Sequence, residues 1–189
     1  ACPLLVDNMM KGVVPAAGKG TRMGHLTEEK PKGLIQVAGK PLLSYAFETL
    51  LEIGVEEIIV IVGYEGGAII DLFGESFAGV PIQYVHQRVR DGMAAAVLQA
   101  EPYIEEKFLI VNGDNVFVDP LSAVISELDE PDVDAGVIVQ EATTQNAAET
   151  GVVQTTTADQ VKQITEKPDD PATQLITTGC YLLPTEIFA

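Results

Sequence analysis

Apolar residues along this chain are grouped in short runs that alternate with segments of helical period. The run EIIVIVG at residues 57–63 has no polar interruption, as expected of a strand covered on both faces of a sheet. Residues 41–54 instead repeat apolar positions every three or four residues, with Leu43, Phe47 and Leu50 on one side. The first pattern predicts a buried β-strand, and the second predicts an amphipathic α-helix.

The two patterns alternate up to about residue 140. Pro41 and Gly54 mark the ends of the first helix, because proline suits the first helical position and glycine commonly follows the last one. The alternation of strands and helices is typical of a parallel or mostly parallel sheet with helices on both faces. The expected strands are residues 11–16, 57–63, 81–87, 107–114 and 134–140, and the expected helices are residues 41–54, 66–74, 92–104 and 120–130.

The pattern changes in the last part of the chain. Residues 150–167 are interpreted as two strands around the turn-like TADQ, and residues 175–184 as one more strand. The segment EATTQNAAE at residues 141–149 is interpreted as a polar loop. Thr185 could cap a helix just where the sequence stops. We therefore expect the C-terminal end of the domain to be missing from the chain.

Composition indicates one folded domain. Of the 189 residues, 47% are hydrophobic, enough for a globular domain with a buried core. No apolar run approaches the roughly 20 residues that span a bilayer, and no stretch resembles a secretory signal, which predicts a cytoplasmic protein. Cys2 and Cys180 lie far apart without metal-ligand spacing, so we expect free thiols. Residues 1–9 precede Met10 and are interpreted as an N-terminal extension outside the fold.

The chain is strongly acidic. Lysine and arginine total 11 against 28 aspartates and glutamates, which gives a formal net charge of −17. Such a surface repels nucleic acid and anionic lipid, so neither is expected as a partner. The acidity has two interpretations: a solubilising surface as in salt-adapted organisms, or a specific cation-binding function. The first is favoured because the acids are spread along the chain. Assembly into a homo-oligomer is compatible with the sequence.

Two loops are expected beyond the carboxyl ends of strands, where open α/β sheets bind ligands. In AAGKGTR, after the first strand, glycines let a ligand approach the backbone, while Lys19 and Arg22 add positive charge. In VNGDNVF, Asp114 stands where a carboxylate could hold a divalent metal. Alone, the first could be an ordinary glycine turn, and the second a turn made by Asp114 and Asn115. Together they are the minimum parts for chemistry on a nucleoside triphosphate.

The segment PAAGKGTRMGHLTEEKPKGLIQVAGKPLLSY closely resembles the opening of the sugar-1-phosphate nucleotidyltransferases, which carry GxGTR, T-x-x-x-P-K and K-P-x-x-x-Y in this order. The resemblance continues in QRVRDGMAAAV, NGDNVF, TGVV, EKP and TTGCY, and covers residues 10–189. It implies a Rossmann-like three-layer α/β nucleotide-diphospho-sugar transferase fold with a mostly parallel central sheet. It also implies a nucleotide-binding part at residues 10–140 and a sugar-phosphate-binding part at residues 141–189.

The resemblance implies a reaction as well. An oxygen of a sugar 1-phosphate, expected to be glucose 1-phosphate, attacks the α-phosphorus of a nucleoside triphosphate, releasing pyrophosphate and forming a nucleotide sugar. Arg22 would neutralise the triphosphate, and Lys32 would lie between the phosphates of the two substrates. Asp114 would hold Mg²⁺ against the α-phosphate. No general base is needed, because the nucleophile is already an anion.

The remaining roles implied by the resemblance concern binding. Gln87 and Gly92 match the base-reading segment, where an amide can pair with the edge of uracil or thymine. Lys167 matches a residue that holds the sugar phosphate. The nucleotide would be bound by Ala16, Ala17, Gly18, Gly20, Thr21, Gln87 and Gly92, and the sugar phosphate by Gly151, Glu166, Lys167, Thr178 and Gly179.

Several alternatives stay open at this point. The nucleotide is UTP or dTTP, because the opening motif is similar to bacterial uridylyltransferases and the spacing elsewhere to thymidylyltransferases. A cytidylyltransferase of the isoprenoid type also starts with PAAG, but the T-x-x-x-P-K spacing and the EKP element argue against it. A regulatory module that binds nucleotide without turnover is the alternative from another class. Retention of Arg22, Lys32, Asp114 and Lys167 favours an enzyme.

Overall fold

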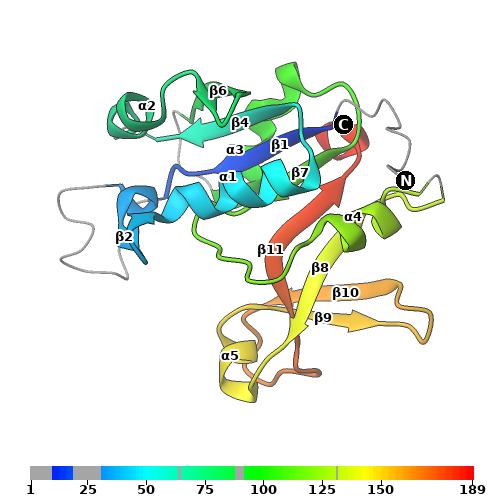
Figure 1. Ribbon diagram of the computed structural model, residues 1–189. Coiled ribbons are helices and arrows are strands. Elements are labelled where there is room, and N and C mark those ends of the chain that lie inside the picture. Colours follow the sequence, from blue (N-terminus) through cyan, green and yellow to red (C-terminus); the bar gives the residue numbers. More distant parts are fainter. Residues whose placement is uncertain (1–9, 19–30, 64, 88–91, 131) are drawn as a thin grey trace. The chain divides into compact units, whose positions relative to one another are not determined.

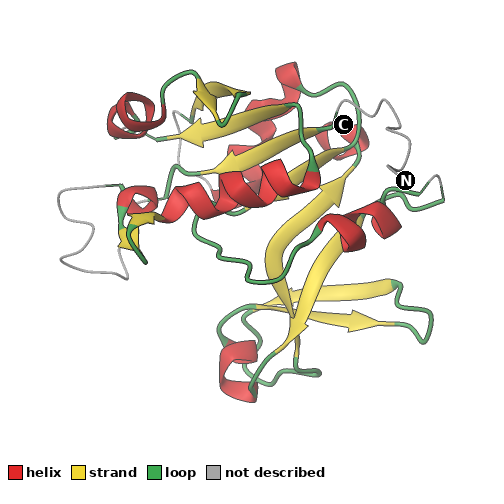
Figure 2. Cartoon of the chain, in the orientation of Figure 1, coloured by secondary structure: helices red, strands yellow, loops and turns green. Residues whose placement is uncertain are grey.

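The computed structural model describes residues 10–18, 31–63, 65–87, 92–130 and 132–189. The chain forms two compact units, the first comprising Ala1–Gly136 and Leu182–Ala189 and the second Val137–Tyr181. The expected strands and most of the expected helices are present (Figures 1 and 2). We predicted a boundary near residue 140. The units divide between Gly136 and Val137, and the last eight residues return to the first unit.

The first unit contains a mostly parallel sheet, as predicted, with strand order β7-β1-β4-β6-β5. β1 pairs in parallel with β4 on one side and with β7 on the other, so that Val13 lies between Ile59 and Ile110. β4 pairs in parallel with β6. Among the described strand pairs of this unit's sheet, the pair of the short β5 with β6 is the antiparallel one. The strands are β1 (Lys11–Pro15), β4 (Glu57–Val62), β5 (Ser76–Phe77), β6 (Val80–His86) and β7 (Phe108–Val111).

Helices cover both faces of this sheet, with α1 in front and α3 behind in the view of Figure 1. The helices of this unit are α1 (Leu42–Ile53), α2 (Gly67–Phe73), α3 (Gly92–Val97) and α4 (Ser122–Leu128), with the 3-10 turns η2 (Lys32–Leu34), η3 (Leu98–Tyr103) and η4 (Thr185–Phe188). A small hairpin of β2 (Gln36–Val37) and β3 (Lys40–Pro41) precedes α1.

Helix α1 follows its sequence pattern closely. Its apolar side, including Phe47 and Leu50, is fully buried. Leu50 packs on β1 at Gly12, where a Cβ would lie 2.6 Å from its methyl carbons. The helix ends at Gly54 in the left-handed conformation, with φ of 96°, as the glycine predicted. Pro41 precedes the helix as its N-cap and is not its first residue.

Two expected helices differ from the prediction. The helix expected at residues 92–104 changes to 3-10 geometry after Val97. Pro102 explains this, because its ring would clash with the carbonyl four residues earlier and it has no N–H to donate. The helix expected from Pro120 begins at Ser122, where the Glu52 carboxylate accepts hydrogen bonds from the backbone N–H groups of Leu121 (3.1 Å) and Ser122 (3.3 Å).

The second unit is an antiparallel arrangement. β9 (Gly151–Thr155) and β10 (Val161–Glu166) form the hairpin predicted around TADQ, and β9 also pairs with β11 (Leu175–Leu183). β8 (Gly136–Glu141) pairs with β11 and does not extend the parallel sheet, so the alternating pattern ends before this strand. The segment expected to be a polar loop contains a short helix, α5 (Thr144–Ala148), which Thr143 caps by accepting a hydrogen bond from Asn146 N at 3.3 Å.

The last residues belong to the first unit. Phe188 of η4 stacks on Phe108 of β7, with ring centroids 5.4 Å apart.

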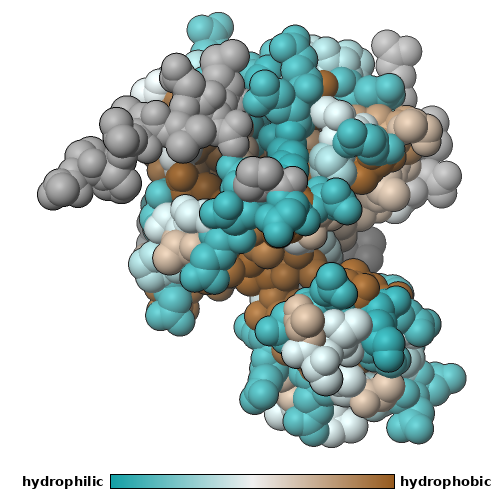
Figure 3. Space-filling model, turned by 90° about the vertical axis from the view of Figure 1, so that its right-hand side faces the viewer, coloured by the Kyte–Doolittle hydropathy of each residue, from teal (hydrophilic) through white to brown (hydrophobic). Residues whose placement is uncertain are grey.

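None of the helices in the described part of the chain combines the length and apolar character that a membrane span requires. Hydrophilic residues are spread over the face shown in Figure 3, in keeping with the spread of charged residues along the sequence.

Candidate active site

A pocket of about 360 Å³ opens in the first unit, where β1, β6 and β7 reach their carboxyl ends. This is the edge of the sheet at which ligands were expected. The pocket is lined by Pro15, Ala16, Ala17, Gly18, Lys32, Gly33, Gln87, Gly92, Met93, Ala96, Asn112, Gly113 and Asp114. The structure therefore brings together in one cavity the expected nucleotide-binding residues that it describes and the two expected catalytic residues that it describes.

The loop after β1 forms one wall of the pocket. Ala16 donates its backbone N–H to Ile61 O at 2.8 Å, which continues the ladder between β1 and β4. Ala17 lies against Gly63, where a Cβ would be 3.0 Å from Ala17 O. A Cβ on Gly18 would meet no atom within 4 Å, so this position faces open space. The remaining residues predicted here, Gly20, Thr21 and Arg22, lie outside the described residues.

Lys32 and Asp114 form an ion pair, with Lys32 Nζ donating to Asp114 Oδ2. Lys32 comes from η2, and Asp114 from the loop after β7. The two side chains keep 29% and 41% of their surface exposed, so both charges remain accessible to a ligand. Half-exposed pairs of this kind contribute little to stability, about 0–1 kcal/mol. The pair places one cation and one carboxylate side by side at the pocket wall.

A glycine follows Lys32 and another precedes Asp114, and the small size of both lets these two segments pack closely against α1. A Cβ on Gly33 would lie 3.2 Å from Leu43 Cβ, and a Cβ on Gly113 would lie 2.9 Å from Leu43 Cδ1. Gly113 is also tight against the backbone, since the same Cβ would be 3.1 Å from Pro15 O. Leu43 itself is fully buried. The fully buried Leu43 therefore supports both segments that carry the ion pair.

Two polar atoms of the pocket are buried and have no hydrogen-bond partner among the described residues, Gln87 Nε2 and Asn112 Oδ1. Gln87 is only 7% exposed, and its backbone N–H is bonded to Val62 O at 2.9 Å, so its position is fixed. A buried amide group without a partner is costly, which indicates a polar ligand at this place. Asn112 was missed by sequence reasoning, although its place at the end of β7, two residues before Asp114, could have indicated it.

The pocket contains further residues that the sequence did not single out for binding. Met93 and Ala96 come from α3, whose first residue, Gly92, was expected in the site and has φ of 80°. Met93 is 47% exposed and thus does not serve core packing alone. An apolar wall with a few convergent polar groups is typical of small-molecule sites.

The donor set of the pocket fits a hard divalent cation. Asp114 supplies a carboxylate oxygen, the type of ligand that Mg²⁺ prefers. No group of three or more histidines, cysteines, aspartates or glutamates that could hold a metal ion occurs among the described residues. Mg²⁺ is usually held by one or two carboxylates together with water and substrate phosphates, so a single carboxylate beside a ligand pocket is compatible with it.

The predicted sugar-phosphate residues lie in the second unit. Gly151 pairs with Glu166 across the β9–β10 hairpin, and a Cβ on Gly151 would lie 3.4 Å from Glu166 Oε2. Lys167 Nζ is 3.3 Å from Glu166 Oε1, and the backbone of Lys167 has the unusual φ of 46°. Thr178 donates its hydroxyl to Ile138 O at 2.8 Å, and the next residue, Gly179, has φ of 76°. The structure thus brings Gly151, Glu166 and Lys167 together.

The structure describes one cysteine, Cys180, and its thiol is not a reactive group. Cys180 is a free, fully buried cysteine, as predicted, and desolvation by burial raises the pKa of its thiol to about 12. A thiol with such a pKa stays protonated at neutral pH, and the protonated thiol is not the nucleophilic form. Cys2 lies outside the described residues.

Comparison with known proteins agrees with the fold. Residues 11–189 match the family described as nucleotidyl transferase. The chain is 41% identical over 179 residues to the UTP–glucose-1-phosphate uridylyltransferase AglF of Haloferax volcanii, covering 95% of this chain and 74% of that protein. It is 35% identical over 182 residues to the low-salt glycan biosynthesis nucleotidyltransferase Agl11 of the same organism, covering 95% of this chain and 50% of Agl11.

Solved structures share the fold. A Bacillus anthracis protein provisionally identified as a glucose-1-phosphate thymidylyltransferase, in complex with sucrose, superposes with a TM-score of 0.89 at 27% identity, over 95% of this chain and 73% of that one. A UDP-glucose pyrophosphorylase complexed with UDP-glucose has a TM-score of 0.84 at 26% identity, over 96% and 78%. These findings confirm the resemblance drawn from the sequence motifs. The chain belongs to the nucleotidyl transferase family.

Proposed function

We propose that this protein is a sugar-1-phosphate nucleotidyltransferase that condenses a nucleoside triphosphate with glucose 1-phosphate. The observation that carries the proposal is the Lys32–Asp114 pair on the wall of a pocket. The pocket also holds Gln87 Nε2, which is buried without a hydrogen-bond partner among the described residues. The relatives support the same reaction, because AglF is a UTP–glucose-1-phosphate uridylyltransferase and the solved structures include a UDP-glucose pyrophosphorylase.

The chemistry requires an in-line displacement at the α-phosphorus. A phosphate oxygen of glucose 1-phosphate forms the new P–O bond, and the bond from the α-phosphorus to the bridging oxygen breaks, so that pyrophosphate leaves with its electron pair. Negative charges approach each other in this step, and a fixed cation lowers the barrier. Lys32 supplies that cation, since its ammonium group lines the pocket and stays accessible.

Asp114 would hold the divalent ion that nucleotidyltransferases generally use, and we propose Mg²⁺. When bound, the metal would neutralise phosphate charge. In the protein without nucleotide, Lys32 neutralises the Asp114 carboxylate. When a triphosphate enters, the ammonium group can turn from the carboxylate to a phosphate oxygen, because Lys32 is a long and flexible side chain. We therefore propose that the two groups act on different partners during the reaction, Lys32 on a phosphate oxygen and Asp114 on the metal.

The nucleotide is proposed to be UTP. AglF, which uses UTP, is 41% identical to this chain, against 27% for the provisional thymidylyltransferase. Gln87 supports recognition of a pyrimidine such as uracil, because an amide offers both a donor and an acceptor to the base edge. Ala16, Ala17, Gly18 and Gly92 would complete the binding surface, together with Gly20, Thr21 and Arg22, which we propose from the motif alone.

The second unit is proposed to bind the sugar phosphate. Lys167 carries an accessible ammonium group, with 46% of its side chain exposed, and Glu166 beside it offers a carboxylate for sugar hydroxyls. A Cβ on Gly151 would lie 3.0 Å from Thr177 Oγ1 and 3.4 Å from Glu166 Oε2, so the glycine lets both side chains lie close to β9. Thr178 and Gly179 would form the floor of this subsite. The observation that supports the proposal is the cluster of Gly151, Glu166 and Lys167 within this unit.

The acidic surface is proposed to be an adaptation to a salt-rich cytoplasm. The 28 acidic residues are spread along the chain, and none of them joins a cluster of three or more metal-binding side chains in the described part. Two relatives come from Haloferax volcanii, one of them a nucleotidyltransferase named for low-salt glycan biosynthesis. A dispersed negative charge keeps a protein soluble.

A pyrophosphate-release assay tests the proposed reaction. The full chain is incubated with glucose 1-phosphate, MgCl₂ and each of UTP, dTTP, CTP and GTP. We expect the highest rate with UTP and no release without the sugar phosphate. Binding of nucleotide without pyrophosphate release from any pair would overturn the enzyme in favour of a binding module. A higher kcat/KM with dTTP would overturn only the choice of base.

A further inference from the structure

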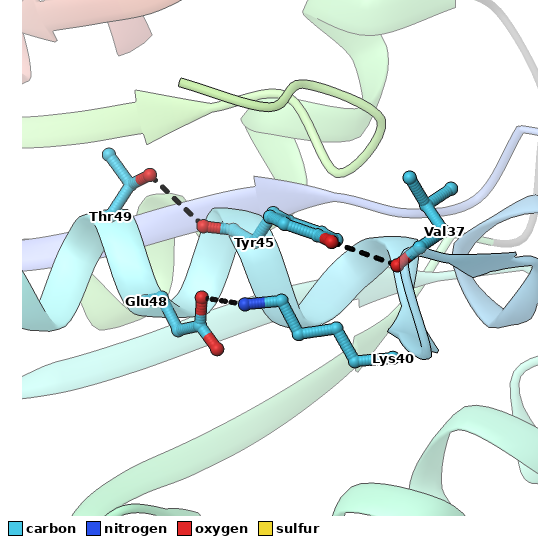
Figure 4. Close-up of polar contacts among 5 residues, drawn as sticks. All are labelled: Val37, Lys40, Tyr45, Glu48 and Thr49. Carbon is cyan, nitrogen blue, oxygen red and sulfur yellow. Dashed lines mark hydrogen bonds and ion pairs between the residues drawn. The ribbon is translucent and has the colours of Figure 1, made fainter. Parts of the chain in front are cut away.

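The motif K-P-x-x-x-Y, formed by Lys40, Pro41 and Tyr45, has no part in the chemistry described above. None of these three residues lines the pocket. The side chains of Lys40 and Tyr45 nevertheless meet at the start of α1 (Figure 4). Lys32 lies shortly before this helix, in η2. This location raises the question of what the motif holds in place.

Tyr45 is bound on two sides. Its hydroxyl donates to Val37 O at 2.8 Å, and the ammonium group of Lys40 lies 4.0 Å from the centre of its ring. The Lys40 ammonium group in turn pairs with the Glu48 carboxylate, one turn further along α1 (Figure 4). The ring of Tyr45, the cation and the carboxylate therefore attach the β2–β3 hairpin to the first turns of the helix.

Among the described residues, the hairpin itself buries little of its surface. Gln36 and Val37 of β2 are exposed, and neither residue of β3 is buried. Its turn consists of Ala38 and Gly39, both with positive φ, as in a tight two-residue hairpin. An isolated two-stranded hairpin is marginally stable in water. The polar contacts of Tyr45 and Lys40 are thus a main constraint on where the hairpin lies.

The hairpin is joined directly to the segment of Lys32. Ile35 donates its N–H to Lys32 O at 3.1 Å, and Leu42 donates to Ile35 O at 2.8 Å, which closes the base of the hairpin. Gly33 packs on Leu43 at the start of α1. A hairpin that shifted relative to α1 would therefore move the backbone from which the Lys32 side chain reaches the pocket.

We propose that Tyr45 is a positioning residue: by fixing the β2–β3 hairpin on α1, it keeps the Lys32 ammonium group at the place where the reacting phosphates meet. The inference rests on the proposed function, because it assigns the effect to catalysis by Lys32. It predicts that loss of one hydroxyl outside the pocket lowers turnover more than it lowers substrate binding.

The chain offers a matched control. Tyr84 of β6 also donates its hydroxyl to a backbone carbonyl at 2.8 Å, that of Gly74, away from the segment of Lys32. Tyr45→Phe and Tyr84→Phe each remove one such bond. A neutral hydrogen bond is worth about 1 kcal/mol, so we expect kcat to fall roughly fivefold in Tyr45→Phe with KM changed less than about twofold. We expect Tyr84→Phe to keep both constants.

A double-mutant cycle tests whether Tyr45 acts through Lys32. If it does, Tyr45→Phe lowers kcat in the wild-type background and has no further effect when Lys32 is already methionine. An equal loss in both backgrounds would overturn the proposal, as would equal losses in Tyr45→Phe and Tyr84→Phe. A rise in KM with kcat unchanged would likewise overturn it, because that result would indicate a binding role.

Hydrogen exchange separates this inference from the proposed function. The peptide covering residues 31–42 should exchange faster in Tyr45→Phe and at the wild-type rate in Tyr84→Phe. Unchanged exchange in Tyr45→Phe would overturn the anchoring of the hairpin whatever the kinetics show. Wild-type protein that releases no pyrophosphate would overturn the proposed function, and the exchange measurement would then decide the anchoring by itself.

Discussion

Lys32 and Asp114 form an ion pair although 82 positions separate them in the sequence. Their segments meet because β7 pairs with β1 and because Gly33 and Gly113 both pack on Leu43 of α1. The buried leucine therefore fixes the spacing between the proposed catalytic cation and the proposed metal-binding carboxylate. This arrangement leads to predictions about each charge and about the glycine beside the carboxylate.

Replacing Lys32 by methionine should lower kcat/KM by roughly 100-fold or more, because an oriented cation at a developing charge contributes several kcal/mol. Stability should change by less than about 1 kcal/mol, since the ion pair is partly exposed. Lys11→Met is the matched control. Lys11 forms a similarly exposed ion pair with Glu57, at 2.9 Å, at the opposite end of β1. Equal kinetic losses in the two variants would contradict the role of Lys32.

Replacing Asp114 by asparagine should abolish Mg²⁺-dependent turnover and leave the fold intact, because the amide is similar in size but carries no charge for the metal. Pyrophosphate release is measured as a function of MgCl₂ concentration, with circular dichroism to check the fold. Asp119→Asn serves as control, since Asp119 is an exposed aspartate of the same loop that does not line the pocket. Near-normal activity of Asp114→Asn would rule out its metal role.

Replacing Gly113 by alanine should destabilise the protein by about 1–3 kcal/mol, as expected for overpacking. The added Cβ would lie 2.9 Å from Leu43 Cδ1 and 3.1 Å from Pro15 O, and the backbone oxygen has little freedom to move away. Gly67→Ala is the control, because a Cβ on Gly67, at the start of α2, meets no atom within 4 Å. Urea denaturation measures both. Equal midpoints for Gly113→Ala and wild type would mean that the Leu43 contact is loose.

The sequence predicted the strands well because burial on both faces leaves uninterrupted apolar runs, as in residues 57–63. It predicted the place of Asp114 for a similar reason, since the polar segment that follows such a run stands at the sheet edge. The Lys32–Asp114 pair could not be predicted, because it depends on which strands become neighbours. Asn112 stands in the same motif, two residues before Asp114, but only the structure reveals that its side-chain oxygen is buried without a hydrogen-bond partner among the described residues.

The errors in the helices have local causes. The helix expected up to residue 104 lost its α geometry after Val97, because the effect of Pro102 reaches four residues back along the chain. The short helix α5 was taken for a loop because its residues are polar, although the capping oxygen of Thr143 could have indicated a helix start. β8 was assigned to the alternating pattern because its composition matches the parallel strands, whereas its partner is β11.

Folding stability should fall at high pH through Cys180. Burial raises the pKa of its thiol from 9.0 to about 12. Because the folded pKa is the higher one, the contribution is fully present below pH 9 and is lost as the pH rises toward 12. The slope in this window is about 1.4 kcal/mol per pH unit. Cys180→Ala should remove this part of the pH dependence when the two proteins are compared by urea denaturation. Parallel curves would contradict the buried, protonated thiol.

Salt should stabilise the protein over a wide range of concentration. With 28 acidic against 11 basic residues, the folded chain is under net self-repulsion, and screening relieves it as the Debye length falls from about 10 Å at 0.1 M to about 3 Å at 1 M. We expect the melting temperature to rise with KCl and equally with NaCl. A rise that saturates at millimolar concentration of one cation would instead indicate a specific cation site. A melting temperature that falls as KCl rises would contradict salt adaptation, because added ions can only weaken the repulsion among dispersed carboxylates.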